Sequence, residues 1–430
     1  QCGGMTVAEY EGVVCAFCGS LCDDITLKVE DNAIVSMTGG CAIGRKRFLS
    51  PPEANAPLVK GRETGLDQAI DAAVRILSSA RYPLIYGLSS TTAEAQAAAV
   101  RLAETLGATI DSTSSVCHGP GTIARQMLGI PTCTLGEVRN RADVVLFWGC
   151  NPVEAHPRHF GRYSVQARGW KTPEGRQNRT LIAVDVRKTL TAKMADVFLQ
   201  VEPNSDFEVL TALRALINGA NLTGDTFGGV PRSQLEKAAQ TLLGAKYGVI
   251  LFGMGLTMSS GCQHNVYQAL MLARDLNDHT AFAVIPMRGH GNVTGAETVM
   301  TWLTGYPFAV NFSRGYPRYS PGEFSAVDVL VRDEADAALV VASDPAATFP
   351  AAAADRFAQI STIVIDPQFS ATAQMAQVYI PSASAGIAAS GTAYRMDGVP
   401  LPLRKLVDSE YPDDRQILNR IEEGVRQCST

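Results

Sequence analysis

The segment Ala142-Asp143-Val144-Val145-Leu146-Phe147-Trp148-Gly149-Cys150-Asn151-Pro152 has the pattern of a buried strand that ends in a polar turn. The segment Ala335-Asp336-Ala337-Ala338-Leu339-Val340-Val341-Ala342-Ser343-Asp344-Pro345 repeats this pattern. Each is followed by a second apolar run that ends in aspartate, at Asp185 and Asp366, and then by a third apolar run. Strands that alternate with helices in this way are typical of a doubly wound parallel sheet. The pattern therefore predicts two Rossmann-like units, although simple α/β periodicity would produce a similar repeat.

The polar residues at these strand ends are candidates for binding a ligand. Doubly wound sheets bind ligands at the carboxyl ends of their strands, and an aspartate after the second strand commonly binds a nucleotide. Neither unit contains G-x-G-x-x-G, which argues against ordinary NAD binding. Between the units, a predicted strand from Val249 runs into Gly253-Met254-Gly255. Glycines at a strand end allow main-chain N–H groups to approach phosphate.

A cysteine and a histidine stand side by side in Ser114-Ser115-Val116-Cys117-His118-Gly119-Pro120-Gly121, after a predicted helix (92–106) and a short strand (108–110). The Gly-Pro-Gly sequence predicts a sharp turn there, with a helix from Thr122 onward. A thiolate beside an imidazole suits a transition metal or a nucleophilic role. The alternative is a buried, inert cysteine beside a structural turn. Another polar strand end, Arg288-Gly289-His290-Gly291-Asn292, offers an arginine that can bind an anion with two hydrogen bonds.

Four cysteines near the start of the chain have the spacing of metal ligands. They are Cys15, Cys18, Cys22 and Cys41, in the pattern C-x2-C-x3-C-x18-C. The alternating run 25–37, with a turn at Asp31-Asn32, predicts a β-hairpin that brings the fourth cysteine back to the first three. Four converging thiolates suit a [4Fe–4S] cluster or zinc. Three closely spaced cysteines with one distant partner favour the cluster over the paired C-x2-C knuckles of zinc.

The composition is that of a globular α/β protein. With 430 residues, of which 46% are hydrophobic, the chain is expected to form several domains. No run reaches the about 18 apolar residues of a membrane helix, and no signal-peptide pattern precedes the first motif, so we expect a cytoplasmic protein without a membrane partner. The net charge of −5 argues against binding of nucleic acid. Residues 1–10 are expected to be flexible.

Taken together, the cysteine motif, the two nucleotide-binding units and the Cys117 turn resemble the molybdopterin oxidoreductase superfamily. Within it, the chain is similar to the B-subunit family of formylmethanofuran dehydrogenases, the tungsten or molybdenum enzymes of methanogenic CO2 reduction. The resemblance extends over essentially the whole chain and is carried by residues 15–24, 115–120, 149–159 and 391–400. It implies a multidomain α/β fold with two Rossmann-like pseudo-repeat units and a small N-terminal iron–sulfur domain.

The resemblance divides the chain into five expected segments. These are an iron–sulfur domain with the hairpin (1–60), an α/β segment with the Cys117 turn (61–140), a first dinucleotide-binding half (141–245), a central α/β segment with the Arg288 loop (246–330) and a second dinucleotide-binding half with the closing segment (331–430).

Roles for individual residues also follow from the resemblance. Cys117 matches the protein thiolate on tungsten or molybdenum, and His118 and Arg288 match the pair that handles protons and the carboxylate. Lys46 matches a lysine between the cluster and a pterin. The other residues expected to bind cofactor are Asn151, His156, Arg158, Asp185, Thr189, Gly253, Gly255, Asp344, Asp366 and Thr392. As alternatives, His118 would only brace the turn, and Arg288 would bind a cofactor phosphate.

The function implied by the resemblance is reduction of CO2 to formate by a catalytic redox subunit. The expected cofactors are a [4Fe–4S] cluster, two molybdopterin guanine dinucleotides and tungsten or molybdenum, which the sequence does not distinguish. Formate would pass to an amidohydrolase-type A subunit, in a complex with C and D subunits and polyferredoxin-type electron donors. The alternatives are a structural subunit of a formyltransferase/hydrolase complex, which has no need of the five ligand cysteines, and a compact formate dehydrogenase.

Overall fold

The structure, a computed structural model, describes residues 7–50 and 55–428. The chain forms two compact units: unit 1 contains Gln1–Val116 and His290–Thr430, and unit 2 contains Cys117–Gly289. The chain thus leaves unit 1 immediately before Cys117 and returns to it immediately after Gly289. Of the two predicted dinucleotide-binding halves, residues 141–245 lie in unit 2 and residues 331–430 lie in unit 1.

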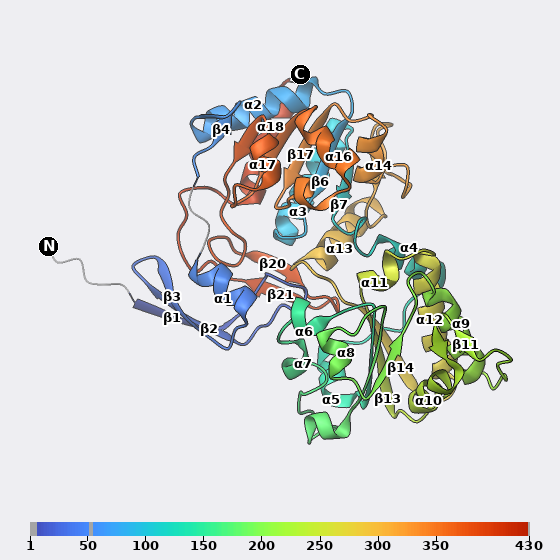
Figure 1. Cartoon of the computed structure of the whole chain (residues 1–430). Coiled ribbons are helices and arrows are strands. Elements are labelled where there is room, and N and C mark those ends of the chain that lie inside the picture. Colours follow the sequence, from blue (N-terminus) through green and yellow to red (C-terminus); the bar gives the residue numbers. More distant parts are fainter. Residues whose placement is uncertain (1–6, 51–54, 429–430) are drawn as a thin grey trace. The chain divides into compact units, whose positions relative to one another are not determined.

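Unit 2 is built on a parallel five-stranded sheet in the order β10-β9-β8-β13-β14. Its strands are β8 (Val144–Trp148), β9 (Thr180–Asp185), β10 (Val197–Gln200), β13 (Tyr247–Phe252) and β14 (Ala281–Pro286). Helices cover one face of the sheet (Figure 1): α4 (Gly119–Leu128), α9 (Asp206–Ile217), α10 (Arg232–Leu243) and α12 (Gln263–Asn277). On the other face, Phe147 stacks on Phe160 of α7 (His159–Arg162) with ring centroids 5.5 Å apart. Because both faces are covered, the strands are mostly apolar, and the polar Asp185 and Gln200 stand at the ends of β9 and β10.

Unit 1 contains the same order of parallel strands inside a nine-stranded sheet, β16-β15-β7-β6-β17-β18-β19-β4-β5. The parallel strands are β6 (Pro83–Gly87), β7 (Thr109–Ser112), β17 (Ala337–Val341), β18 (Ser361–Ile365) and β19 (Val378–Ile380). Antiparallel strands flank them: β4 (Leu58–Val59), β5 (Arg62–Glu63), β15 (Val310–Asn311) and β16 (Arg318–Tyr319). The order β19-β18-β17-β6-β7 therefore corresponds to β10-β9-β8-β13-β14 of unit 2.

Helices also cover both faces of the sheet of unit 1 (Figure 1). One face packs against α2 (Leu66–Ser79), α3 (Ala93–Leu106), α13 (Val293–Thr304) and α18 (Asp414–Cys428). The other face packs against α14 (Ala326–Val331), α16 (Ala351–Ala354) and α17 (Ala371–Met375). Residues of one strand alternate between these two cores, so Ile85 joins the first and Leu84 and Tyr86 join the second. No helix of the described residues is long and apolar enough to cross a membrane.

The aspartates that open the two repeated sequences make the same hydrogen bonds. The Asp143 carboxylate accepts from the main-chain N–H groups of Lys246 and Tyr247, at 3.0–3.1 Å. The Asp336 carboxylate accepts from those of Arg81 and Tyr82, at 2.8 and 3.0 Å. Each aspartate thus anchors the main chain just before or at the start of the neighbouring strand, β13 or β6.

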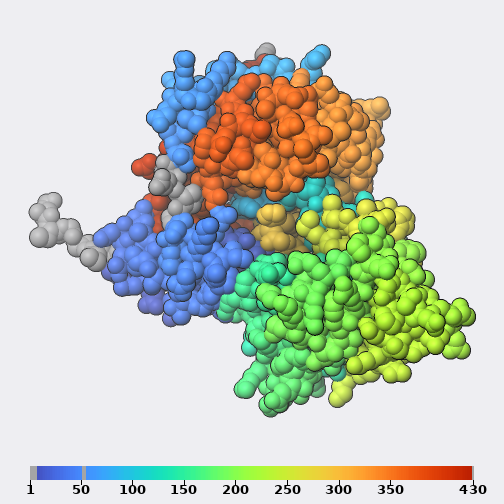
Figure 2. All heavy atoms as spheres, in the orientation of Figure 1, coloured from blue at the N-terminus to red at the C-terminus, as the bar shows by residue number. Residues whose placement is uncertain are grey.

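The N-terminal segment of unit 1 is a small antiparallel sheet in the order β1-β2-β3, followed by α1 (Ala42–Leu49). Its strands are β1 (Val7–Val13), β2 (Ile25–Glu30) and β3 (Ala33–Thr38). The predicted hairpin is confirmed, and Asp31 and Asn32 form its turn with φ of 44° and 63°, which aspartate and asparagine tolerate. The predicted flexibility of residues 7–10 is wrong, because they pair with β2; residues 1–6 lie outside the described part. Figure 2 shows this segment in dark blue, and of β1 only Val13 is buried.

A separate turn was predicted for the Gly-Pro-Gly sequence after His118, and this prediction is wrong. The sequence instead forms the first turn of α4. A proline in the first turn of a helix lacks an N–H group that would have no partner there, so the signals for a turn and for a helix start are the same. Gly121 is needed for packing, because an added Cβ would lie 3.2 Å from the ring of Phe252 at the end of β13. The start of α4 therefore lies directly against the end of that strand.

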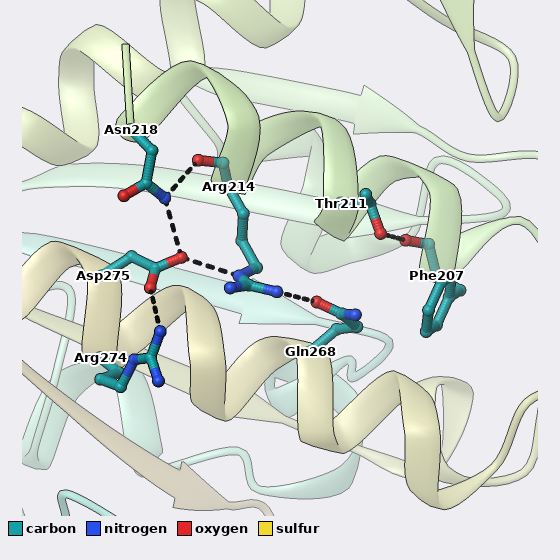
Figure 3. A network of polar contacts seen from close by, with 7 residues as sticks. All are labelled: Phe207, Thr211, Arg214, Asn218, Gln268, Arg274 and Asp275. Carbon is teal, nitrogen blue, oxygen red and sulfur yellow. Dashed lines mark hydrogen bonds and ion pairs between the residues drawn. The ribbon is translucent and has the colours of Figure 1, made fainter. Parts of the chain in front are cut away.

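A network of charged and polar side chains joins α9 to α12 in unit 2 (Figure 3). The buried Asp275 carboxylate accepts from Arg214 Nε at 2.8 Å and from Asn218 Nδ2 at 3.0 Å. Arg214 Nη1 also donates to Gln268 Oε1, at 2.6 Å. Burial opposes ionisation of Asp275, but the hydrogen bonds from Arg214 and Asn218 outweigh it and hold its pKa below the ordinary value.

We expect Asp275→Asn to lower the free energy of unfolding by about 2 kcal/mol, because Arg214 would lose a charge-assisted partner in a half-buried site. Because the folded-state pKa is lowered, this difference should be full above the ordinary aspartate pKa and should vanish as the pH falls through the lowered value. Urea denaturation at several pH values measures it. Glu236→Gln, in the exposed pair of Glu236 with Arg232, is the control and should cost about 0.5 kcal/mol or less. Equal losses in the two variants at neutral pH would contradict the prediction.

Candidate functional site

Cys117 and His118 are the first residues of unit 2 and are buried, with 7% and 1% of their surfaces exposed. The Thr257 hydroxyl, at the end of α11 (Met254–Thr257), donates to the Cys117 carbonyl at 2.7 Å. Nε2 of His118 donates to the Met287 carbonyl at 3.0 Å, and the His118 ring lies edge-on to Phe252 with centroids 5.8 Å apart. Cys117 and His118 are therefore held against the ends of β13 and β14 by contacts within unit 2.

Arg288 follows β14 by two residues, and only 2% of its surface is exposed. The main-chain carbonyl of Arg288 accepts a hydrogen bond from His156 Nε2 at 2.7 Å. His156 is buried at the end of α6 (Pro152–Ala155), and burial lowers its pKa. Its imidazole is therefore neutral near pH 7, with the proton on the nitrogen that donates to Arg288. The structure thus brings together the predicted Cys117-His118 pair, Arg288 and His156.

Asn151 and Asp344 occupy the same position in the two sheets, at the N-cap of a short helix after β8 or β17. The helices are α6 and α15 (Pro345–Thr348). Asn151 Oδ1 accepts from the main-chain N–H and the hydroxyl of Thr191, at 3.2 and 2.7 Å. Asp344 Oδ1 accepts from the same groups of Thr372, at 2.9 and 2.6 Å. Each side chain thus joins the end of a first strand to the helix that follows the second strand.

Thr189 caps that second helix in unit 2, α8 (Leu190–Lys193), by accepting from Ala192 N–H at 3.2 Å. Ser370, which the sequence did not single out as a site residue, caps α17 through the same contact with Ala373 N–H, also at 3.2 Å. The sequence contains a signal for this capping residue, because Ser370 follows Asp366 at the same spacing at which Thr189 follows Asp185.

Asp185 is the last residue of β9, and Asp366 directly follows β18; these are the second strands of the two repeats. Asp366 is 9% exposed, and its Oδ1 accepts from Gln368 N–H at 2.7 Å. Burial, reinforced by the nearby charges of Asp414 and Asp344, raises the pKa of Asp366 to about 7. Burial also raises the pKa of Asp185. A ligand that donates N–H or O–H groups to these carboxylates would offset part of the cost of their ionisation.

Gly253 and Gly255 are explained by packing of the main chain. A Cβ on Gly253 would lie 2.6 Å from the carbonyl oxygen of Gly149, and a Cβ on Gly255 would lie 2.7 Å from the Cα of Gly149. Gly255 N–H also donates to the Gly149 carbonyl at 2.9 Å. These glycines therefore allow the ends of β8 and β13, where the order of strands reverses, to approach each other closely.

The four N-terminal cysteines lie near one another in unit 1. Cys15 N–H donates to the Cys22 carbonyl at 2.8 Å, and the Leu21 N–H donates to the Cys18 carbonyl at 3.1 Å, so this loop closes on itself. Cys41 is the N-cap of α1, on which Lys46 is exposed. Burial, and then the charges of the other three thiols, raise the pKa of Cys15.

Because burial raises the pKa of Cys15 and of Cys18, these two thiols would need a cationic group beside them to exist as thiolates. As they stand, the residues of the described ranges contain no group of three or more His, Cys, Asp or Glu side chains arranged to hold a metal ion. The donor set and its mutual proximity nevertheless suit a group that supplies positive charge to all four sulfurs.

Thr392 and Arg158, two other predicted cofactor residues, have different surroundings. Thr392 lies in β20 (Gly391–Tyr394), which pairs with β21 (Pro400–Leu403) in unit 1. The N–H and hydroxyl of Thr392 donate to the Glu94 carboxylate at 2.9 and 2.8 Å, so its side chain is engaged within the protein. Arg158 is half-buried at the N-cap of α7 in unit 2.

No family model matches the chain, but relatives and solved structures do. The B subunit of tungsten-containing formylmethanofuran dehydrogenase 2 from Methanocaldococcus jannaschii is 48% identical, over 98% of this chain and 99% of that subunit. The subunit of the same name from Methanococcus maripaludis is 46% identical, over 93% and 94%. Formate dehydrogenase H of Escherichia coli is 25% identical over 64% of this chain and 44% of its own length. A chain in the crystal structure of the formyltransferase/hydrolase complex from Methylorubrum extorquens, with methylofuran, superposes with a TM-score of 0.72 at 26% identity, covering 87% of this chain and 99% of that one.

We expect Thr257→Val to increase the rate at which iodoacetamide alkylates Cys117 in the cofactor-free chain. The Cys117 carbonyl would lose its hydroxyl partner, at a cost of about 1 kcal/mol, so the open population should rise about fivefold. Peptide mass spectrometry measures the rate, with alkylation of the buried Cys133 as the internal control. Thr257→Ser retains the hydroxyl and should react like the wild type. Equal rates for the valine variant and the wild type would refute this expectation.

Proposed function

The chain belongs to the family of B subunits of tungsten-containing formylmethanofuran dehydrogenases, and we propose that it is the redox subunit in which CO2 is reduced to formate. It is a tungsto- or molybdopterin-dependent oxidoreductase by family. The observation that carries the proposal is the convergence, within unit 2, of Cys117, His118 and Arg288. A soft ligand, an imidazole and a guanidinium in one buried region are the groups that this reduction requires.

Each of these residues has a distinct part in the proposal. The Cys117 thiolate would hold tungsten or molybdenum, which supplies two-electron chemistry when the pterin cofactor is bound. The Arg288 guanidinium binds and orients the carboxylate by charge-assisted hydrogen bonds. His118 already uses Nε2 to bind the Met287 carbonyl, so a proton would be exchanged at Nδ1. Burial of all three excludes water from the reacting region.

We further propose that Cys15, Cys18, Cys22 and Cys41 hold a [4Fe–4S] cluster that delivers single electrons. Support comes from the closed loop that carries the first three cysteines and from the mutual influence of the four thiols. Lys46, one turn after Cys41 on α1, would lie between the cluster and a pterin. The environment of a cluster sets its potential through charge and hydrogen bonds, so a lysine in that position would stabilise the reduced form.

The two parallel sheets would each bind one molybdopterin guanine dinucleotide at the carboxyl ends of their strands. Support comes from their common strand order and from the matched contacts of Asn151 and Asp344. The residues proposed for the two sites are Asn151, Arg158, Asp185, Thr189, Gly253 and Gly255 in unit 2, and Asp344, Asp366 and Thr392 in unit 1. For the glycines and Thr392, binding would use main-chain groups or the outer surface, because packing and Glu94 already engage them.

Formate made in this subunit would pass to a partner subunit that condenses it with methanofuran. The alternative function is that of a structural subunit in a formyltransferase/hydrolase complex. One observation for it is the likeness to a chain of such a complex. A structural subunit has no chemical need for a thiol at Cys117 or for four clustered thiols in unit 1. Their presence supports the redox function over the structural one.

We expect Cys117→Ser to lower formate oxidation with an artificial electron acceptor by at least about 100-fold, because a hydroxyl is a poorer ligand for a soft metal than a thiolate. Hydrolysis of formylmethanofuran by the complex should persist, since that reaction needs no electrons. Cys133→Ser, at another buried cysteine, is the matched control and should keep both activities. Full formate oxidation by the Cys117→Ser complex would defeat the redox assignment.

We expect the anaerobically purified chain to contain about four iron atoms and no stoichiometric zinc in its N-terminal segment. Cys18→Ser should remove this iron, while Cys428→Ser, at an exposed cysteine, should not. Elemental analysis and electron paramagnetic resonance of the reduced protein give both readouts. One zinc atom per chain, retained by the wild type and lost with Cys18→Ser, would show that the site is a zinc site.

A further inference from the structure

We infer that His156 is a positioning residue for Arg288: its imidazole, together with that of His118, sets the conformation of the main chain that carries the arginine. The inference rests on the proposed role of Arg288 and adds to it the element that aims the guanidinium. It also assigns to His156 a role other than the direct binding of cofactor that the sequence suggested.

The first support is the position of the two hydrogen bonds. His118 Nε2 binds the Met287 carbonyl at 3.0 Å, and His156 Nε2 binds the Arg288 carbonyl at 2.7 Å. These carbonyls belong to the two peptide planes on either side of the Arg288 Cα. Because each peptide unit is planar, holding both planes restricts φ and ψ of Arg288 and hence the direction of its Cα–Cβ bond.

The second support is the difference between the two sides of Arg288. On the N-terminal side, Met287 N–H donates to the Phe252 carbonyl at 2.8 Å, so the end of β14 is tied to β13. On the C-terminal side stands Gly289, where an added Cβ would meet no atom within 4 Å. Glycine in open space leaves the chain many conformations. The hydrogen bond from His156 is therefore the restraint that counteracts this freedom immediately after Arg288.

The third support is that His156 is itself firmly held. Its N–H donates to the Pro152 carbonyl at 2.8 Å, and its carbonyl accepts from His159 N–H at 2.8 Å. It is the C-cap of α6, and Asn151 is the N-cap of the same four-residue helix. One short helix thus connects the end of β8, where a pterin dinucleotide is proposed to bind, to the carbonyl of the proposed substrate-binding arginine.

The test compares His156→Phe, which keeps a buried ring and removes the donor, with His156→Gln, whose amide nitrogen can donate from a similar distance along the side chain. His159→Phe is the matched control, because it removes a buried histidine of the same segment that bonds Ser164 instead of the Arg288 region. If His156→Phe does not fold, His156→Asn serves, because its shorter side chain does not reach the carbonyl. The anaerobically purified complex is used throughout.

Hydrogen exchange of the peptide that covers residues 285–291 gives a readout that does not depend on activity. We expect exchange there to increase at least fivefold in His156→Phe, to stay near the wild-type rate in His156→Gln and to be unchanged in His159→Phe. Tungsten or molybdenum and pterin contents should be retained in all three. Unchanged exchange in His156→Phe would overturn the inference. Loss of pterin from His156→Phe with unchanged exchange would also overturn it, in favour of cofactor binding.

Kinetics test the consequence for the arginine. We expect His156→Phe to raise KM for formate about tenfold, with a smaller change in kcat. The KM of His156→Gln should lie close to the wild-type value. In an Arg288→Ala background, His156→Phe should have little further effect, because the residue acts through Arg288. Additive effects would contradict the inference. If exchange rises as expected but Arg288→Ala leaves formate oxidation intact, the positioning holds and the proposed role of Arg288 fails.

Discussion

The constraint on which the rest of this structure depends is that both of its parallel sheets are covered on both faces. Strands buried in this way are mostly apolar, so most of their polar side chains lie at the ends, with the buried Asp111 of β7 as an exception. In unit 2, Asn151, Asp185 and Arg288 all follow or end a strand of one sheet. In unit 1, Asp344 and Asp366 do the same. The residues that could meet a cofactor are thus gathered at strand ends by the requirements of the core.

Polar groups at such buried ends need hydrogen-bond partners, and here the partners are mostly main-chain groups of other strand ends or helix starts. Thr257, His118 and His156 bind three carbonyls, those of Cys117, Met287 and Arg288. The same contacts that satisfy these groups therefore restrict the conformation of the residues proposed to bind metal and substrate. Held by rigid elements, such residues meet the demand for precise placement that catalysis makes.

The connections of the chain distribute these residues in a regular way. β7 and β14 are the last strands in the sheet orders β19-β18-β17-β6-β7 and β10-β9-β8-β13-β14. The chain passes from one unit to the other a few residues after each of them. The helix that follows β7, α4, belongs to unit 2, and the helix that follows β14, α13, belongs to unit 1. Cys117 and Arg288 lie at these two passages. Along the chain, the proposed metal ligand follows β7 of unit 1 and the proposed substrate-binding residue follows β14 of unit 2. The two residues therefore come after equivalent strands, although both belong to unit 2.

The sequence by itself determined the features that depend on neighbouring residues. The apolar runs predicted the strands, the Asp31-Asn32 turn predicted the hairpin, and the spacing from Asp185 and Asp366 contained the capping residues Thr189 and Ser370. Local signals also misled, since Gly-Pro-Gly opens α4 instead of forming a turn.

Only the tertiary structure decided which strands complete each sheet and which groups meet. β6 and β7 are the fourth and fifth strands of a set whose other members begin at Ala337. His156 and Arg288 are separated by 132 residues, and Cys117 and Thr257 by 140. Gly253 and Gly255 are required by the approach of Gly149, about a hundred residues earlier. Periodicity and capping report the conformation of a segment, but a hydrogen bond between distant segments depends on how all of them pack, and no local pattern carries that information.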